Sequence, residues 1–217
     1  MNNFKLVWSV KSECGPKRKK NEDSVYPNKS GSGKTPFKAG VFDGMGGHKK
    51  GEVASSIAAS VMKLELENIE DYVTKANEEI IFSQNNNPDS EGMGTTMTAV
   101  EIDNDGVLNI AHVGDSRCYV LSNRQLIQLT DDENVPGFQN VLLQALGTTK
   151  KLDVQRKDFK LSKGCVVLLC TDGLYNEFGE EYLKKKLLEG ISADTLISEV
   201  LLQQPKDNVS AIIINVV

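Results

Sequence analysis

The sequence predicts an α/β (α+β) fold, a four-layer αββα sandwich with two central, mostly antiparallel sheets flanked by helix pairs. Strand-like segments follow one another through tight turns, which favours antiparallel sheets. Two pairs of amphipathic helices interrupt the strands, and each pair must cover one face of a sheet. No internal repeat or linker divides the chain, so residues 1–217 are expected to form one domain.

The first part of the chain is predicted to alternate between strands and loops. Residues 4–10 have the mixed apolar character of a strand, and a second strand covers residues 37–42. Residues 13–36 are polar and contain several lysines, glycines and prolines, which predicts a loop. Within this loop, Gly31–Thr35 imitates the end of a phosphate-binding P-loop, but Asn28 replaces the required upstream glycine and no helix follows. We therefore expect a flexible loop tip.

Helices and a strand meander are expected to make up the rest. Helical periodicity predicts helices at 51–67 and 69–83. A strand meander follows at 95–102, 107–113, 117–121 and 125–129, and its first hairpin turns at Asp103–Gly106. Residues 131–147 are expected to be irregular. Strands at 152–159 and 165–171, helices at 178–189 and 193–203, and a strand at 209–216 complete the prediction.

Composition and charge exclude several classes of protein. The net charge of −5 argues against nonspecific nucleic-acid binding, which requires a basic surface. No segment is long and apolar enough to span a bilayer, and residues 1–5 lack the apolar region of a signal peptide. None of the four cysteines lies in a Cys-x-x-Cys pair, and Cys118, Cys165 and Cys170 lie in apolar runs. Free buried thiols in a cytoplasmic protein are therefore favoured over zinc or disulfide sites.

Four acidic residues lie at the ends of apolar, strand-like runs: Asp43, Asp115, Asp172 and Asp207. The glycine-rich turn after Asp43 would let the backbone approach a small charged ligand. Mg²⁺ and Mn²⁺ prefer carboxylate, carbonyl and water ligands, and no histidine cluster indicates zinc. If the four strand ends converge, the acids form one hard-metal site. Each acid also has an alternative interpretation as a turn former or a helix cap, which competes with the metal role mainly at Asp115.

Such a site is suited to hydrolysis at phosphorus. A carboxylate that bridges two ions holds them ~3.5–4 Å apart and can prepare a bridging hydroxide as nucleophile. Arg18, close to Glu22 and Asp23, offers the bidentate phosphate recognition that lysine cannot match. Alone, this run would be interpreted as a solvated charged segment. The chain has no Cys-x5-Arg signature, so a phosphatase with a cysteine nucleophile is not indicated.

Six motifs occur in an order that closely resembles the metal-dependent protein phosphatases (PPM, type 2C) in their short bacterial form. They are Arg18–Asp23, Val41–His48, Gly94–Thr96, Gly114–Arg117, Cys170–Leu174 and Asp207–Ser210. The resemblance covers nearly the whole chain. It implies a β-sandwich flanked by helix pairs, with a binuclear Mn²⁺/Mg²⁺ centre that hydrolyses phosphoserine and phosphothreonine in proteins. A partner Ser/Thr kinase is a further expectation.

The resemblance also assigns a role to each matching residue. Asp43 would bridge the two ions, the Gly44 carbonyl would complete one of them, and Asp172 and Asp207 would hold the other. Glu22 and Asp23 would orient metal-bound waters, and Arg18 would bind the substrate phosphate. Asp115 matches an acid that helps to form a third, weaker metal site. Gly94–Thr96 would support the centre through close backbone packing.

The sequence departs from the family at several positions. The longer mobile flap of bacterial members is reduced here to Glu133–Gln144, Gln144 stands where an arginine is common, and Glu133 replaces a frequent histidine. Met45 occupies the place of a histidine found in some relatives, so either His48 or a metal-bound water would be the general acid. His112, inside a predicted strand, is expected to be structural.

Two other functions stay open at this point. The chain could be a non-catalytic binding or regulatory module on the same fold, although the intact set of acids argues against it. It could also be a metal phosphoesterase that acts on small metabolites.

Overall fold

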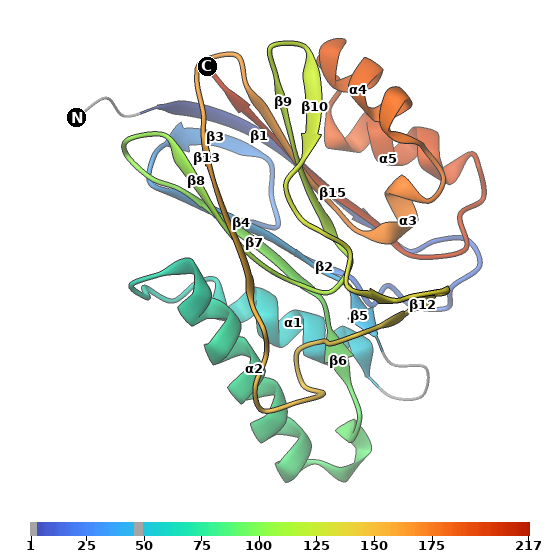
Figure 1. The fold of residues 1–217 in the computed structure, drawn as a ribbon. Coiled ribbons are helices and arrows are strands. Elements are labelled where there is room, and N and C mark those ends of the chain that lie inside the picture. The colour runs from blue at the N-terminus through green and yellow to red at the C-terminus, as the bar shows by residue number, and fades with distance from the viewer. Residues whose placement is uncertain (1–3, 46–49) are drawn as a thin grey trace.

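The computed structural model describes residues 4–45 and 50–217. The predicted four-layer arrangement is confirmed: two large sheets stack face to face, and helices cover both outer faces (Figure 1). Every strand pairing among the described residues is antiparallel. None of the helices in these residues has the length and apolarity needed to cross a membrane.

The first sheet has six strands and the second has five. The first runs in the order β10 (Gln125–Gln128), β9 (Arg117–Ser122), β14 (Val166–Cys170), β15 (Val209–Val216), β1 (Lys5–Glu13) and β3 (Gly31–Lys34). The second runs in the order β13 (Gln155–Lys160), β8 (Val107–Val113), β7 (Met97–Ile102), β4 (Phe37–Phe42) and β2 (Ser24–Tyr26). Two small two-stranded sheets are also present: β5 (Gly44–Met45) pairs with the distant β6 (Gly94–Thr95), and β11 (Asn134–Val135) forms a hairpin with β12 (Phe138–Leu142).

Three apolar clusters hold the layers together. The cluster between the sheets includes Leu6, Val100 and Ile212, each fully buried. A second cluster packs α1 (Gly51–Val61) and α2 (Ile69–Asn86) on the five-stranded sheet. A third packs α3 (Asp172–Tyr175), α4 (Glu180–Leu188) and α5 (Ala193–Leu201) on the six-stranded sheet. Burial of apolar surface on both faces of each sheet is the main stabilising contribution.

Local sequence signals fix where several helices begin and end. The Asn68 backbone N–H donates to Asp71 Oδ2 at 3.1 Å at the start of α2, and Ser192 Oγ accepts from the Thr195 N–H at 3.3 Å at the start of α5. The first helix ends at Val61, earlier than residue 67, and beyond its end the Leu64 carbonyl accepts from Tyr72 Oη at 2.9 Å. A short 3₁₀ turn, η1 (Pro88–Ser90), follows α2.

The loop predicted over residues 13–36 is wrong in part, because β2 and β3 lie within it. The segment Gly31–Thr35, predicted to be a flexible loop tip, supplies the edge strand β3, which pairs with β1. Its glycines pack against the ring of Trp8, whose Nε1 donates to the Lys29 carbonyl at 2.9 Å. The polar sequence of β3 does not resemble a strand, because an edge strand needs few apolar residues. Here its packing comes from the single aromatic ring of Trp8. The irregular segment 131–147 likewise contains β11 and β12.

Candidate active site

The four acids predicted from strand ends do come together at one end of the two sheets. Asp43 follows β4 and Asp115 follows β8 in one sheet, whereas Asp172 follows β14 and Asp207 precedes β15 in the other. The acids are close enough for their charges to interact: Asp172, Asp207 and Asp115 all raise the pKa of Asp43, and Asp207 and Asp115 raise that of Asp172. Figure 1 shows α3, β5 and β12 at this same end of the sandwich. The predicted convergence is therefore present in the fold.

Asp23 connects the site to the six-stranded sheet through hydrogen bonds. Its side chain is only 8% exposed, and its Oδ2 accepts hydrogen bonds from Thr171 Oγ1 at 2.9 Å and from Ser210 Oγ at 2.6 Å. These two hydroxyls come from the segments that carry Asp172 and Asp207. The sequence motifs contain both residues, but sequence reasoning assigned them no role. The sequence signal for this role is the presence of a hydroxyl residue close to each acid: Thr171 next to Asp172, and Ser210 three residues after Asp207.

Close backbone contacts at glycines bring the segments together. A Cβ atom on Gly44 would lie 2.3 Å from the Glu22 carbonyl oxygen, and one on Gly173 would lie 2.0 Å from the Asn208 carbonyl oxygen. No side chain fits at either position without moving backbone. The Gly44 N–H donates to the Glu22 carbonyl at 3.2 Å, and Ser55 Oγ donates to the same oxygen at 2.6 Å. Glu22 and Asp43 are thus held near each other by main-chain contacts.

The surroundings of three acids disfavour their ionised forms in the absence of a cation. Burial, reinforced by neighbouring carboxylates, raises the pKa of Asp43 well above its usual range. Burial and the charge of Asp207 likewise raise the pKa of Asp172 to about 7. Burial also raises the pKa of Asp23 to about 7, despite its two hydroxyl donors. A cation among these groups would favour their ionised forms.

Two buried carboxylate oxygen atoms also favour a bound cation at this site. Asp23 Oδ1 and Asp172 Oδ1 are buried and have no hydrogen-bond partner among the described residues. A buried, unpaired carboxylate oxygen is costly, so a ligand is the natural partner for both. Within the described part of the chain, no group of three His, Cys, Asp or Glu side chains is arranged so that it could hold a metal ion by itself. An open carboxylate site suits Mg²⁺ or Mn²⁺, because Mg²⁺ usually keeps several waters and uses one or two protein carboxylates.

Two buried threonines hold the main chain of Asp43 in place through hydrogen bonds. The Thr96 N–H and Thr95 Oγ1 both donate to the Asp43 carbonyl at 2.9 Å, while Thr96 Oγ1 accepts from the Asp43 N–H at 3.0 Å. The motif containing these threonines was predicted to support the centre. Thr96 Oγ1 also bonds Ser116 Oγ at 2.8 Å, so the support extends to the segment of Asp115.

His112 continues this buried network and is structural, as expected. It is fully buried, with Nδ1 2.8 Å from Thr98 Oγ1 and Nε2 2.9 Å from the Gly114 carbonyl. Burial lowers its pKa to about 4, so it is neutral at working pH. The other histidine, His48, lies outside the described residues. The four cysteines are all free thiols.

Arg18 lies at the site and contacts an acid. Its Nη2 donates to Asp207 Oδ2, its Nε donates to the Lys206 carbonyl at 3.2 Å, and its Nη1 lies 3.9 Å from Glu22 Oε2. The side chain keeps 41% of its surface exposed. The predicted phosphate-binding residue is therefore next to the acids and reachable from solvent.

The segment that corresponds to the reduced flap is fastened to the same end of the sheets. Asn134 Nδ2 donates to Asp115 Oδ2 at 3.0 Å, and Glu133 Oε2 accepts from the Gly114 N–H at 2.8 Å. Gln144 Nε2 donates to Glu133 at 3.1 Å and to the Asp153 carbonyl at 2.6 Å. The two departures from the expected residues, Glu133 and Gln144, thus bond to each other.

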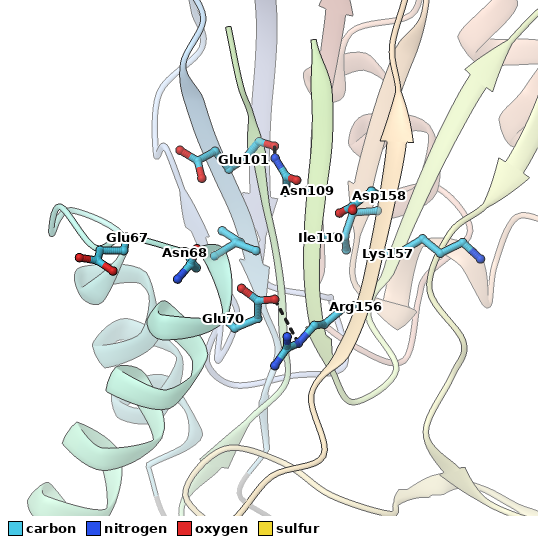
Figure 2. Close-up of a pocket in the computed structure, with 10 residues that line it drawn as sticks. Glu67, Asn68, Glu70, Glu101, Asn109, Ile110, Arg156, Lys157 and Asp158 are labelled. Atoms are coloured by element: carbon cyan, nitrogen blue, oxygen red, sulfur yellow. Dashed lines mark hydrogen bonds and ion pairs between the residues drawn. The ribbon is translucent and has the colours of Figure 1, made fainter. Parts of the chain in front are cut away.

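A separate pocket of about 610 Å³ lies between the start of α2 and strands β7, β8 and β13 (Figure 2). An ion pair spans it, with Arg156 Nε 3.0 Å from Glu70 Oε1. Its other charged residues carry both signs, and none of the predicted site residues lines it. It is therefore not part of the acidic site.

Comparison with known proteins identifies the arrangement. The profile of the family described as protein phosphatase 2C matches residues 17–201. The chain belongs to the protein phosphatase 2C family. Among its relatives, the serine/threonine phosphatase stp of Listeria monocytogenes is 33% identical, over 94% of this chain and 93% of that protein. The serine/threonine protein phosphatase PstP of Mycobacterium tuberculosis is 30% identical over 98% of this chain, which covers 45% of PstP.

Solved structures from the phosphatase 2C family have the same fold. The M. tuberculosis PstP crystal structure superposes with a TM-score of 0.87 at 28% identity, covering 98% of this chain and 99% of that one. A PstP catalytic domain in complex with two manganese ions gives a TM-score of 0.86 at 29% identity, covering 99% of both chains. The resemblance predicted from six short motifs is thereby confirmed at the level of family and fold.

Proposed function

We propose that this protein is a metal-dependent protein serine/threonine phosphatase that uses two Mn²⁺ or Mg²⁺ ions. The observation that carries the proposal is the mutual approach of Asp43, Asp172 and Asp207 beside buried carboxylate oxygens that have no partner. Its relatives are named serine/threonine phosphatases, and one of them has been solved with two manganese ions. Phosphoserine and phosphothreonine proteins are the corresponding substrates.

The residues of the site have complementary roles in this proposal. When bound, the two ions supply a water acidic enough to attack phosphorus near neutral pH. Asp43 and the Gly44 carbonyl hold the ions on the side of the five-stranded sheet. Asp172 and Asp207 hold them on the side of the six-stranded sheet. The pair of ions would thus draw its ligands from both sheets, and the arrangement of those ligands depends on the packing between the sheets.

The remaining groups position water and substrate. Glu22 and Asp23 orient the water, and Asp23 can do so through Oδ1 because Oδ2 is fixed by two hydroxyls. Arg18 binds the phosphate oxygens with its planar fork of N–H donors. Asp115 contributes to a third, weaker ion. Protonation of the departing serine or threonine alkoxide falls to His48 or to water.

The cellular compartment and the partners are inferred from the cysteines and the net charge. Free thiols at all four cysteines favour a reducing compartment, so we place the enzyme in the cytoplasm, in signalling opposite a Ser/Thr kinase. Residues 1–217 act as a single phosphatase domain. Neither a membrane nor a nucleic acid is expected as partner, given the net charge of −5.

Mn²⁺ titration of phosphate release from a phosphothreonine peptide tests the function. Turnover should depend on Mn²⁺, stop with EDTA and return when Mn²⁺ is added. Asp43→Asn or Asp172→Asn should lower kcat by more than about 100-fold, because even outer partners of metal ligands typically contribute 10–100-fold. Asp158→Asn, on the exposed side of β13, is the matched control and should be neutral.

Three outcomes would contradict the proposal. Turnover unaffected by EDTA would exclude metal dependence. A folded protein that binds Mn²⁺ but hydrolyses no phosphopeptide would be a binding module. A kcat/KM for small phosphorylated metabolites far above that for phosphopeptides would indicate a metabolite phosphoesterase.

A further inference from the structure

A cluster centred on Arg117 lies beside the acidic site and has no part in the roles above. Arg117 is the first residue of β9, two residues after Asp115. Its Nε donates to Asp132 Oδ1 at 2.8 Å and its Nη2 donates to Asp132 Oδ2 at 2.6 Å. Its Nη1 donates to Tyr119 Oη at 2.8 Å. The guanidinium carbon lies 3.6 Å from the centre of the Tyr175 ring.

Two of the three partners of Arg117, Tyr175 and Asp132, lie in segments that contact Asp115. Tyr175 ends α3, the helix that begins at Asp172, and its hydroxyl donates to the Asp115 carbonyl at 3.0 Å. Asp132 precedes Asn134 by two residues, and Asn134 Nδ2 donates to Asp115 Oδ2 at 3.0 Å. The main chain and the side chain of Asp115 are therefore each fixed by a segment that Arg117 holds.

The chemistry of the cluster requires arginine. A bidentate pair with a carboxylate and stacking on an aromatic ring both use the planar guanidinium, and lysine can supply neither geometry. The Arg117 and Asp132 side chains retain only 20% and 25% of their exposure, so solvent screens their attraction weakly.

We propose that Arg117 is a positioning residue: through Tyr175 and the Asp132–Asn134 segment, it sets the orientation in which Asp115 binds a divalent cation. This rests on the proposed function, since it assumes that Asp115 is a ligand. In metal sites, partners that orient a ligand typically contribute 10–100-fold to metal affinity. The reduced flap would then act by fixing Asp115 instead of moving over the site.

A matched control lies between α4 and α5, the helices that cover the six-stranded sheet. There Lys186 lies 5.3 Å from the centre of the Tyr182 ring, and both side chains bond to Glu199. Tyr182→Phe removes one hydroxyl from a cation–aromatic–carboxylate cluster, as Tyr175→Phe does, but away from the acids.

The test measures Mn²⁺ binding to the metal-free protein by calorimetry and by the electron paramagnetic resonance signal of free Mn²⁺. Asp115→Asn first identifies the binding step that depends on Asp115. Arg117→Lys and Tyr175→Phe should weaken that same step by about 10–100-fold. KM for a phosphopeptide at saturating Mn²⁺ should be unchanged, and Tyr182→Phe should alter neither quantity.

The outcomes separate this proposal from the function on which it rests. If Arg117→Lys and Tyr175→Phe lower only the melting temperature, and leave every Mn²⁺ affinity unchanged, the cluster is purely structural and the proposal is wrong. It is also wrong if Asp115→Asn shifts no binding step while Mn²⁺-dependent hydrolysis persists. A wild-type protein without Mn²⁺-dependent hydrolysis would instead contradict the proposed function. Tyr175→Phe keeps the ring in place, so the test holds even if Arg117→Lys does not fold.

Discussion

Arg18 is bonded to the acid Asp207 and is also exposed to solvent. A substrate arriving from solvent could therefore reach its guanidinium. Its guanidinium offsets part of the negative charge of the site, and the charges of Asp207, Asp43 and Glu22 together raise the pKa of Arg18 although burial opposes them. In this position, Arg18 can exchange its hydrogen bond to Asp207 for hydrogen bonds to a substrate phosphate with little movement of its side chain.

Replacing Arg18 with alanine should separate substrate binding from metal binding. Hydrogen bonds to a charged group contribute about 1.5–3 kcal/mol, and the exposure of Arg18 favours the lower end, so KM for a phosphothreonine peptide should rise by about tenfold. Mn²⁺ affinity should stay equal or become slightly tighter, because a competing cation is removed. Steady-state kinetics and calorimetry measure the two effects.

Arg156→Ala provides the control for the loss of an exposed, ion-paired arginine, since Arg156 pairs with Glu70 in the separate pocket (Figure 2). It should change neither KM nor metal affinity. Weaker Mn²⁺ binding in Arg18→Ala would contradict the assignment and place Arg18 among the residues that support the ligands.

At the scale of elements, the sequence predicts what local patterns encode and misses what depends on distant contacts. The helix pairs, β7 to β10, β15 and the acids at strand ends were predictable, because periodicity and turn chemistry act within a few residues. The edge strand β3 was not, because its pairing with β1 and its packing on Trp8 are set by residues more than twenty positions away.

The same limit applies to the candidate site. The acids themselves stand out in the sequence, but the two hydroxyls that fix Asp23 and the bonds that Arg117 makes to Asp132 and Tyr175 exist only after folding. Thr171 and Ser210 do lie close to the acids in sequence, but nothing local indicates that they bind Asp23 or that Tyr175 packs against Arg117. The general acid stays a prediction, because His48 lies outside the described residues.

The two glycines of β3 give a test of how this edge strand is held. A Cβ on Gly31 would lie 2.9 Å from Trp8 Cζ2, whereas one on Gly33 would lie 3.5 Å from the same ring, an ordinary contact. The hydrogen bond to Lys29 and the contact with Phe37 restrict movement of Trp8. Gly31→Ala should therefore lower the free energy of unfolding by about 1–3 kcal/mol, the usual effect of overpacking.

Gly33→Ala is the matched comparison and should be neutral or stabilising by up to about 1 kcal/mol, because alanine restricts the unfolded chain. Chemical denaturation of both variants measures the difference. Equal effects at the two positions would show that Trp8 does not hold β3 in the way described.

For the whole molecule, the acidic site couples stability to pH. Without metal, Asp23 and Asp172 have pKa values raised to about 7, compared with about 3.9 for an unfolded aspartate. Between these values the folded protein holds protons that the unfolded chain has released. Its free energy of unfolding must therefore fall as pH rises through this window. His112 acts in the opposite direction, because its folded pKa of about 4 lies below its unfolded value of about 6.5.

The balance of these groups gives a defined expectation. Below about pH 6.5 the raised acids, Asp43 among them, outweigh one histidine, and above it no histidine opposes them, so the metal-free protein should melt at a lower temperature at pH 8 than at pH 5.5. Glu52 and Glu199, whose pKa values are lowered, titrate below this range and do not disturb it. Saturating Mn²⁺ should stabilise the protein more at pH 8, because metal binds the deprotonated carboxylates.

Melting curves in EDTA and in Mn²⁺ across this range measure both effects, and Asp23→Asn provides the internal check. Asparagine removes one titrating group, so the variant should lose part of the decline between pH 5.5 and 8 in EDTA. A melting temperature that rises with pH in the absence of metal would mean that the carboxylates are already ionised at acidic pH. The mutual repulsion that makes this site require cations would then be absent, and the two ions would have to be held for another reason.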